Sequence, residues 1–181
     1  RLLLAAGTTR FAPTLITASE EALCGALAAI AEACRQSPLL SAMIPFVHVE
    51  GPSLDPADGP RGAHPLEHVR RPSLEEFARW QQAGEGLVGL VTLSPHYDEA
   101  PAYIAALVAQ GVLVSIGHTG ATSEQVTAAV DAGARLSTHL GNGAASTLPR
   151  HPNFIWAQLA DDRLTASFIA DGHPLPAATL K

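Results

Sequence analysis

The sequence is poor in cysteine, in aromatic residues and in charge. Its 181 residues include two cysteines, and only 5% are aromatic and 15% charged. We expect Cys24 and Cys34 to lie on one helix about 15 Å apart, a distance that no disulfide spans. This excludes a disulfide-built secreted scaffold, and two unpaired thiols favour a reducing compartment, so we expect a cytoplasmic protein.

Long hydrophobic runs and clusters of basic residues are also missing. The apolar stretches are broken by charge, Gly or Pro well before the roughly 20 residues that a transmembrane helix needs. The formal net charge is -6, and arginines and lysines are not grouped with aromatic side chains. We therefore expect neither a membrane nor a nucleic acid as a partner.

What is present suffices for one domain with a sizeable core, because 47% of the residues are hydrophobic. Apolar, β-branched runs alternate with segments of helical spacing. Strands are predicted at 11–17, 43–50, 87–93, 112–116, 134–139 and 164–170. Helices are predicted at 20–35, from 72 onward, and at 98–110, 123–132 and 153–160. A long loop is predicted at 51–72. This alternation indicates an α/β fold with a parallel sheet covered on both faces.

Each predicted strand ends in a polar residue. These residues are Thr17, Glu50, Ser94, His118, His139 and Asp171. Polar groups at the carboxyl end of every strand are typical of a (β/α)8 TIM barrel, whereas a doubly wound sheet binds its ligand at one switch point. We predict a partial barrel over residues 1–181 with about six of the eight β/α units, and the missing initial Met suggests a fragment that lacks strands at both ends.

Three of these polar residues form a candidate metal site. Glu50 ends one strand before Gly-Pro, and His118 and His139 end two consecutive strands 21 residues apart. A divalent ion held by two imidazoles and a carboxylate keeps a position open for water, which it acidifies. The pattern therefore predicts a metal-dependent hydrolase, although a lone histidine at a strand end is more often structural.

The other histidines are interpreted individually. His48 lies two residues before Glu50 on the same strand face, and we prefer a structural role for it over a role behind the metal ligands. His64, in the long loop, is a candidate substrate contact or a solvated loop residue. No chemistry is assigned to the remaining loop histidines, which are His68, His96 and His151.

Two loops contain candidate anion-binding groups. Asn142 and Gly143 follow His139 in a loop of small residues, where backbone N–H groups can bind an anion. Arg150 offers a bidentate phosphate contact, or it is an ordinary solvated charge. Asp171 and Gly172, at the end of the last predicted strand, are expected to lie at the same carboxyl end of the barrel as the metal site.

Taken together, the motifs resemble those of the N-acetylglucosamine-6-phosphate deacetylases in the amidohydrolase superfamily. The similar segments span nearly the whole chain. They are Gly7-Thr8-Thr9, Pro13 to Thr17, His48 to Pro52, Gly62-Ala63-His64-Pro65, Gly117-His118-Thr119, Thr138 to Asn142 and Asp171-Gly172.

The resemblance implies a site and a reaction. Glu50, His118 and His139 would bind zinc, or alternatively iron, manganese or cobalt. An amino sugar phosphate would be bound by Ala63, His64, Asn142, Gly143, Arg150, Asp171, Gly172 and His173. The reaction would convert N-acetylglucosamine 6-phosphate to glucosamine 6-phosphate and acetate, in a homo-oligomer of the full-length protein.

The chain also departs from the family pattern. Pro174 stands where the family has a histidine, and His173 is displaced by one position; the loop around Asn142 lacks the usual Phe and Met. These differences indicate a divergent subgroup. The family's general acid/base aspartate is expected beyond Lys181, so these residues alone would be weakly active or inactive. The alternatives are an amidohydrolase for another N-acyl or cyclic amide, and a non-catalytic metal- or ligand-binding barrel.

Overall fold

Six parallel strands form one sheet in the computed structural model, which describes residues 2–173, 175–176 and 178–179. The strands are β1 (Thr14–Ile16), β2 (Val47–Glu50), β3 (Val88–Leu93), β4 (Leu113–Ile116), β5 (Leu136–Ser137) and β6 (Thr165–Ala166). Their spatial order is β1-β2-β3-β4-β5-β6, so each strand pairs with its neighbour in sequence. This order differs from that of a doubly wound sheet, in which the strand order reverses.

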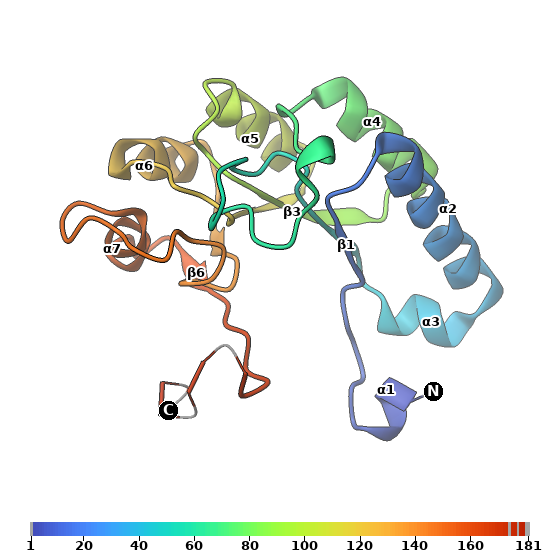
Figure 1. Ribbon diagram of the computed structural model, residues 1–181. Helices are drawn as coiled ribbons and strands as arrows, with labels where there is room; N and C mark the ends of the chain where they lie inside the picture. Colours follow the sequence, from blue (N-terminus) through green and yellow to red (C-terminus); the bar gives the residue numbers. More distant parts are fainter. Residues whose placement is uncertain (1, 174, 177, 180–181) are drawn as a thin grey trace.

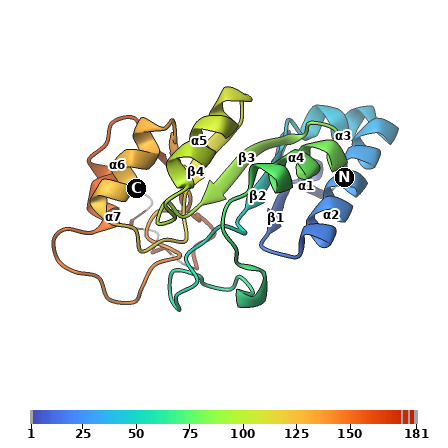
Figure 2. The same cartoon turned by 90° about the horizontal axis from the view of Figure 1, so that it is seen from above.

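Helices connect the strands. They are α1 (Leu2–Ala5), α2 (Glu20–Gln36), α3 (Pro38–Met43), α4 (Leu74–Ala83), α5 (Ala100–Ala109), α6 (Ser123–Asp131) and α7 (Phe154–Leu159), with a short 3-10 helix, η1, at Leu66–His68. Figure 1 shows α2, α4, α5 and α6 side by side along one side of the sheet. Figure 2 shows α2 beside β1 at one end of this array and α6 and α7 at the other.

Local sequence explains where most helices begin. Ser19 caps α2 by accepting from the Ala22 N–H, and Glu20 follows in the first turn. Thr122 and Gln125 form a capping box at the start of α6. The helices predicted from the sequence are confirmed to within two or three residues at most boundaries.

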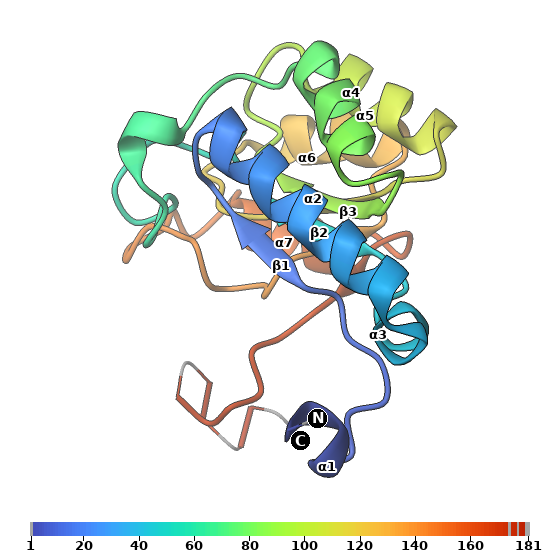
Figure 3. The same ribbon diagram turned by 90° about the vertical axis from the view of Figure 1, so that its right-hand side faces the viewer.

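The hydrophobic core lies between the sheet and the helices. Val49 of β2 and Val91 of β3 are 0% and 1% exposed on the helix-facing side of the sheet. They pack in one cluster with Leu27 of α2 and Ile104 of α5. Figure 3, a side view, shows α2 lying across β1 and β2 on this outer side.

The opposite face of the sheet is lined by polar side chains. His48, Thr92 and Ser115 project from it, while Ile16 and Leu113 on the same face are 51% and 45% exposed. The expectation of a sheet covered on both faces is therefore wrong for the described residues. The strands carry isolated hydroxyl residues between aliphatic ones, so their sequences read as apolar runs although Thr92 and Ser115 line the second face.

Two further expectations need correction. Residues 38–43 form α3, because Ser37 accepts from the Leu40 N–H as an N-cap and Pro38 takes the first helical position; the predicted strand at 43–50 therefore begins only at Val47. The strands predicted at 134–139 and 164–170 pair over only two residues each. None of the helices in the described part of the chain has both the length and the apolar character needed to cross a membrane.

Candidate metal centre

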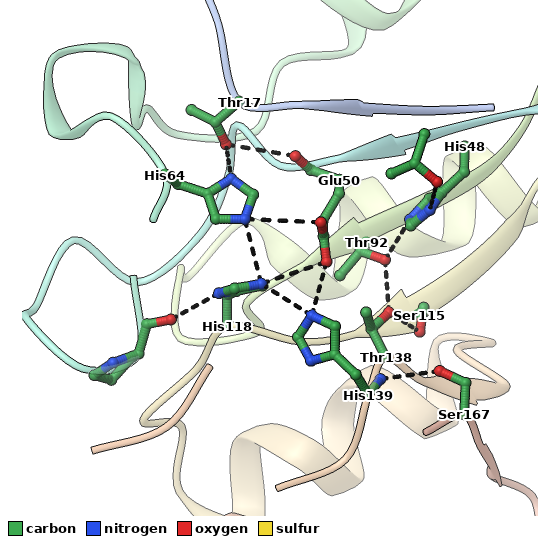
Figure 4. Close-up of polar contacts among 12 residues, drawn as sticks. Thr17, His48, Glu50, His64, Thr92, Ser115, His118, Thr138, His139 and Ser167 are labelled. Atoms are coloured by element: carbon green, nitrogen blue, oxygen red, sulfur yellow. Dashed lines mark hydrogen bonds and ion pairs between the residues drawn. The ribbon is translucent and has the colours of Figure 1, made fainter. Parts of the chain in front are cut away.

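Glu50, His118 and His139 meet at the carboxyl ends of β2, β4 and β5. Nε2 of His139 lies 3.0 Å from Oε1 of Glu50, and Nε2 of His118 lies 3.3 Å from the same oxygen. The two Nε2 atoms are 3.1 Å apart. The structure thus brings together the three residues that the sequence predicts as metal ligands (Figure 4).

The spacing of these three atoms fits one small divalent cation. Donors bound about 2.1 Å from a shared ion lie roughly 3.0 Å apart at octahedral angles and roughly 3.4 Å apart at tetrahedral angles. The three observed separations, 3.0, 3.1 and 3.3 Å, lie within this range. The side chains are therefore placed as three ligands on one side of an ion would be.

The tautomer of His118 provides an independent test of the fit. Nδ1 of His118 lies 2.8 Å from the Pro60 carbonyl oxygen, which can only accept, so Nδ1 carries the hydrogen. In the neutral ring, Nε2 then presents its lone pair to Glu50 and His139. Facing lone pairs and a carboxylate are satisfied by a cation between them, either a metal ion or, in its absence, a proton on Nε2, and a backbone partner behind the ring is typical of metal-bound histidine.

Electrostatics favour the charged form of Glu50. Burial of this carboxyl, which is 8% exposed, opposes ionisation, but hydrogen bonds and charge from His118 and His139 outweigh it and hold its pKa well below the usual range. Glu50 is therefore an anionic ligand at neutral pH.

The backbone at both histidines is unusual. His118 and His139 have φ angles of 49° and 30°, a left-handed region that costs energy for residues other than glycine. The surrounding structure stabilises both conformations: the Asp55 N–H donates to the His118 carbonyl at 3.0 Å, and the His139 N–H donates to Ser167 Oγ at 2.9 Å. Strain held in this way at two convergent side chains is typical of a functional site.

His64 is the fourth side chain at the cluster. It is 4% exposed, and its Nε2 lies 3.2 Å from Nε2 of His118 and 3.7 Å from Oε2 of Glu50. Burial, followed by the nearby charge of His118, lowers the pKa of His64 to about 4, so the ring is neutral at neutral pH. The solvated-loop interpretation of this residue is thus wrong.

Thr17 supports His64 from the end of β1. Its Oγ1 lies 2.9 Å from Nδ1 of His64 and donates to the Glu50 carbonyl at 3.4 Å. Gly51 makes room for this contact, since a Cβ at that position would lie 2.1 Å from Thr17 Oγ1. The sequence marks Thr17 as a polar strand end but does not indicate that it supports His64.

His48 lies below the cluster in a layer of hydrogen-bonded side chains. Its Nδ1 is 3.1 Å from Thr14 Oγ1, and its Nε2 is 2.8 Å from Thr92 Oγ1. Thr138 continues the layer, with its Oγ1 2.7 Å from the hydroxyls of both Thr92 and Ser115. Because both ring nitrogens of His48 are engaged within the sheet, the structure agrees with the preferred structural interpretation.

The loop after His139 lies against the cluster. A Cβ on Gly143 would lie 2.7 Å from Nδ1 of His118, and the Gly143 carbonyl accepts from the Thr119 N–H at 3.2 Å. Asn142 has a buried Nδ2 atom without a hydrogen-bond partner among the described residues. Two predicted substrate contacts thus lie close to the metal ligands.

The other predicted contacts are on the surface. Ala63 and Arg150 are exposed, and so are Asp171, Gly172 and His173. The Asp171 carboxylate accepts from the His173 N–H at 2.9 Å within its own turn. The structure does not bring these side chains to the cluster, and their substrate role stays a prediction. Pro174, which replaces the family's usual histidine, lies outside the described residues.

Comparison with known proteins gives a consistent result. No family model matches the chain. The chain is 38% identical to the N-acetylglucosamine-6-phosphate deacetylase of Bacillus subtilis, with 94% of this chain and 44% of the relative covered. It is 36% identical to the N-acetylgalactosamine-6-phosphate deacetylase of a Shewanella species, with 94% and 42% covered. The chain thus spans less than half the length of these curated relatives.

Solved structures agree with the sequence comparison. The crystal structure of N-acetyl-D-glucosamine-6-phosphate deacetylase from Mycobacterium smegmatis matches with a TM-score of 0.85 and 37% identity, over 96% of this chain and 44% of that one. A mutant of that enzyme, solved in complex with N-acetyl-D-glucosamine-6-phosphate, matches equally well. By sequence and by fold, nearly the whole of this chain is similar to somewhat less than half of an N-acetylglucosamine-6-phosphate deacetylase.

Proposed function

We propose that the full-length protein is a metal-dependent amide hydrolase that converts N-acetylglucosamine 6-phosphate to glucosamine 6-phosphate and acetate. The convergence of Glu50, His118 and His139 is the observation that carries this proposal. The names of the relatives supply the reaction. The sequential strand order supports the further proposal that the six strands are part of a (β/α)8 barrel.

The three ligands define the chemistry that a bound metal ion would supply at this site. Held by Glu50, His118 and His139, a divalent ion would supply Lewis-acid polarisation of the acetamide carbonyl and a more acidic water for its hydrolysis. Glu50 contributes one negative charge, and the two imidazoles bind through Nε2. We propose zinc as the ion, because a carboxylate and two histidines form a known catalytic zinc set; iron, manganese and cobalt are the alternatives.

His64 is proposed to contact the reacting amide, since its Nε2 lies beside the ligands and its Nδ1 is held by Thr17. The neutral ring offers one nitrogen to the substrate at neutral pH. Because His64 is almost fully buried, its ring would shield one side of a bound acetamide from bulk water.

The sugar phosphate is proposed to bind along the loops after β4 and β5. A cavity of about 200 Å³ lies between residues 120–123, which closely follow His118, and residues 148–149 and 152–154, which flank Arg150 in the sequence. The exposed Arg150 is the proposed phosphate contact, and the unpartnered Nδ2 of Asn142 is a donor for a sugar hydroxyl. Ala63, Gly143 and the segment Asp171, Gly172 and His173 complete the proposed contacts.

A second candidate substrate is the epimer N-acetylgalactosamine 6-phosphate. Two relatives, 36% and 34% identical over about the same part of the chain, bear the name of that deacetylase. We also propose that the full-length protein forms a homo-oligomer. A cytoplasmic location is proposed as well, supported by the free cysteines Cys24 and Cys34.

The experiment is acetate release by the full-length protein, measured with both epimeric 6-phosphates and with unphosphorylated N-acetylglucosamine, beside metal analysis of each preparation. We expect metal in the parent, loss of it in Glu50→Gln, and faster release from a 6-phosphate than from the free sugar. Metal without acetate release from either epimer would move the proposal to another N-acyl or cyclic amide. Absence of metal from the parent would refute it.

A further inference from the structure

Asp55 connects the loop after Glu50 with the loop that contains His118. Its backbone N–H donates to the His118 carbonyl at 3.0 Å. Its Oδ2 accepts from the Gly120 N–H at 3.0 Å, and its Oδ1 accepts from the Ala57 N–H at 2.9 Å. One residue thus forms hydrogen bonds on both sides of Thr119, immediately after the metal ligand.

These bonds act on the strained part of the backbone. With a φ of 49°, His118 occupies the left-handed region without being a glycine, and such a conformation persists only where neighbouring contacts enforce it. The Asp55 carboxylate accepts the hydrogen bond of the Gly120 N–H, which therefore needs no other acceptor. Gly120 also fits closely, since a Cβ there would lie 3.1 Å from Asp55 Oδ2.

Asp55 is itself held in place by its neighbours. The Tyr97 hydroxyl donates to the Leu54 carbonyl at 2.9 Å, and the Ser94 N–H donates to the Ser53 carbonyl at 2.8 Å. Leu54 is 0% exposed and Ser53 is 5% exposed. Because residues 53–54 are fixed against the end of β3, Asp55 is a rigid link between the Glu50 and His118 loops.

We propose that Asp55 is a positioning residue for the metal centre: through the His118–Gly120 backbone it sets the direction of the His118 imidazole and its separation from Glu50. This inference rests on the proposed function, because it presumes that Glu50, His118 and His139 bind a divalent ion. Asp55 does not touch the ion, so its loss changes the geometry and affinity of the site without removing a ligand.

The test is metal affinity and geometry in the full-length protein. Asp55→Ala is expected to weaken Zn²⁺ binding, measured by competition with a chromophoric chelator, by ~10- to 100-fold, the usual effect of losing a partner behind a ligand. Asp55→Asn, which keeps one acceptor oxygen, should fall between Ala and the parent. The visible spectrum of Co²⁺-loaded protein should change in the same order, whereas loss of stability alone would leave this spectrum unchanged.

Asp58→Ala is the matched control, since it removes a carboxylate from the same loop. The Asp58 side chain is 93% exposed and pairs with Arg61. It should bind Zn²⁺ like the parent. If Asp55→Ala does not fold, Asp55→Asn decides: weaker binding than Asp58→Ala supports the proposal, and equal binding overturns it. If the parent protein binds Zn²⁺ and both Asp55 variants bind it with the same affinity, only this inference is refuted. Parent protein that binds none would refute the proposed function as well.

Discussion

Glu50 and His139 are separated by 89 residues in the chain, yet Oε1 of the first lies 3.0 Å from Nε2 of the second. Parallel strands explain this proximity, because their carboxyl ends all lie at one edge of the sheet, and residues that end different strands become neighbours there. His118 joins the pair from the strand between β3 and β5. The convergence of the three side chains therefore depends on strand order, whereas local sequence marks each of them only as the end of a strand.

Removing either partner of this pair should empty the metal site. Glu50→Gln preserves the shape but not the charge, and His139→Ala removes an imidazole. Each should weaken metal binding by more than the ~10- to 100-fold expected for a residue behind a ligand, so that purified protein carries well under one ion per site. Elemental analysis measures this stoichiometry. His151→Ala, at an exposed histidine, is the control, and full metal content in both ligand variants would refute the site.

Arg150→Ala should weaken binding of a phosphorylated substrate and leave the metal content unchanged. Loss of a charged hydrogen bond to phosphate costs about 1.5–3 kcal/mol, or roughly 10- to 100-fold in KM. The unphosphorylated sugar should be unaffected. The control is Arg10→Ala, an exposed arginine that precedes β1 at the opposite end of the sheet. Equal KM values for the phosphosugar in Arg150→Ala and the parent would contradict the assignment.

His64 should make the metal-free protein less stable in acid. Its pKa is about 4 in the folded state, against 6.5 for the free side chain, so the unfolded chain takes up its proton first as the pH falls. Stability is thus fully present above pH 6.5 and declines towards pH 4, by on the order of 2–3 kcal/mol. Chemical denaturation at several pH values measures this slope, and it should be shallower in His64→Gln. An unchanged slope would contradict the assignment.

His48→Ala should reduce stability while sparing the metal site. The substitution opens a cavity and leaves the buried Thr92 hydroxyl without one of its partners, which costs about 2–4 kcal/mol in the free energy of unfolding. Urea denaturation of the metal-free protein gives the stability, and elemental analysis gives the metal content. A loss of metal without a loss of stability would indicate that His48 acts on the site instead.

Local sequence accounts for much of the fold. Ser19 and Thr122 as N-caps explain where α2 and α6 begin, because capping depends on side chains and N–H groups within one turn. The ends of β2 and β4 follow from apolar runs that stop at Glu50 and shortly before His118. The sequence therefore located the candidate metal ligands and the six strands, as features that depend on the order of neighbouring residues.

Tertiary structure decided what surrounds the ligands. Asp55 and Pro60 contact the His118 segment from the loop after β2, and Pro60 does so with a carbonyl that every residue possesses, so no sequence pattern indicates these partners. The burial of His64 and its lowered pKa likewise depend on the packing of a distant loop against β1 and β4. Such contacts join residues far apart in the chain, and only the folded backbone sets their distances.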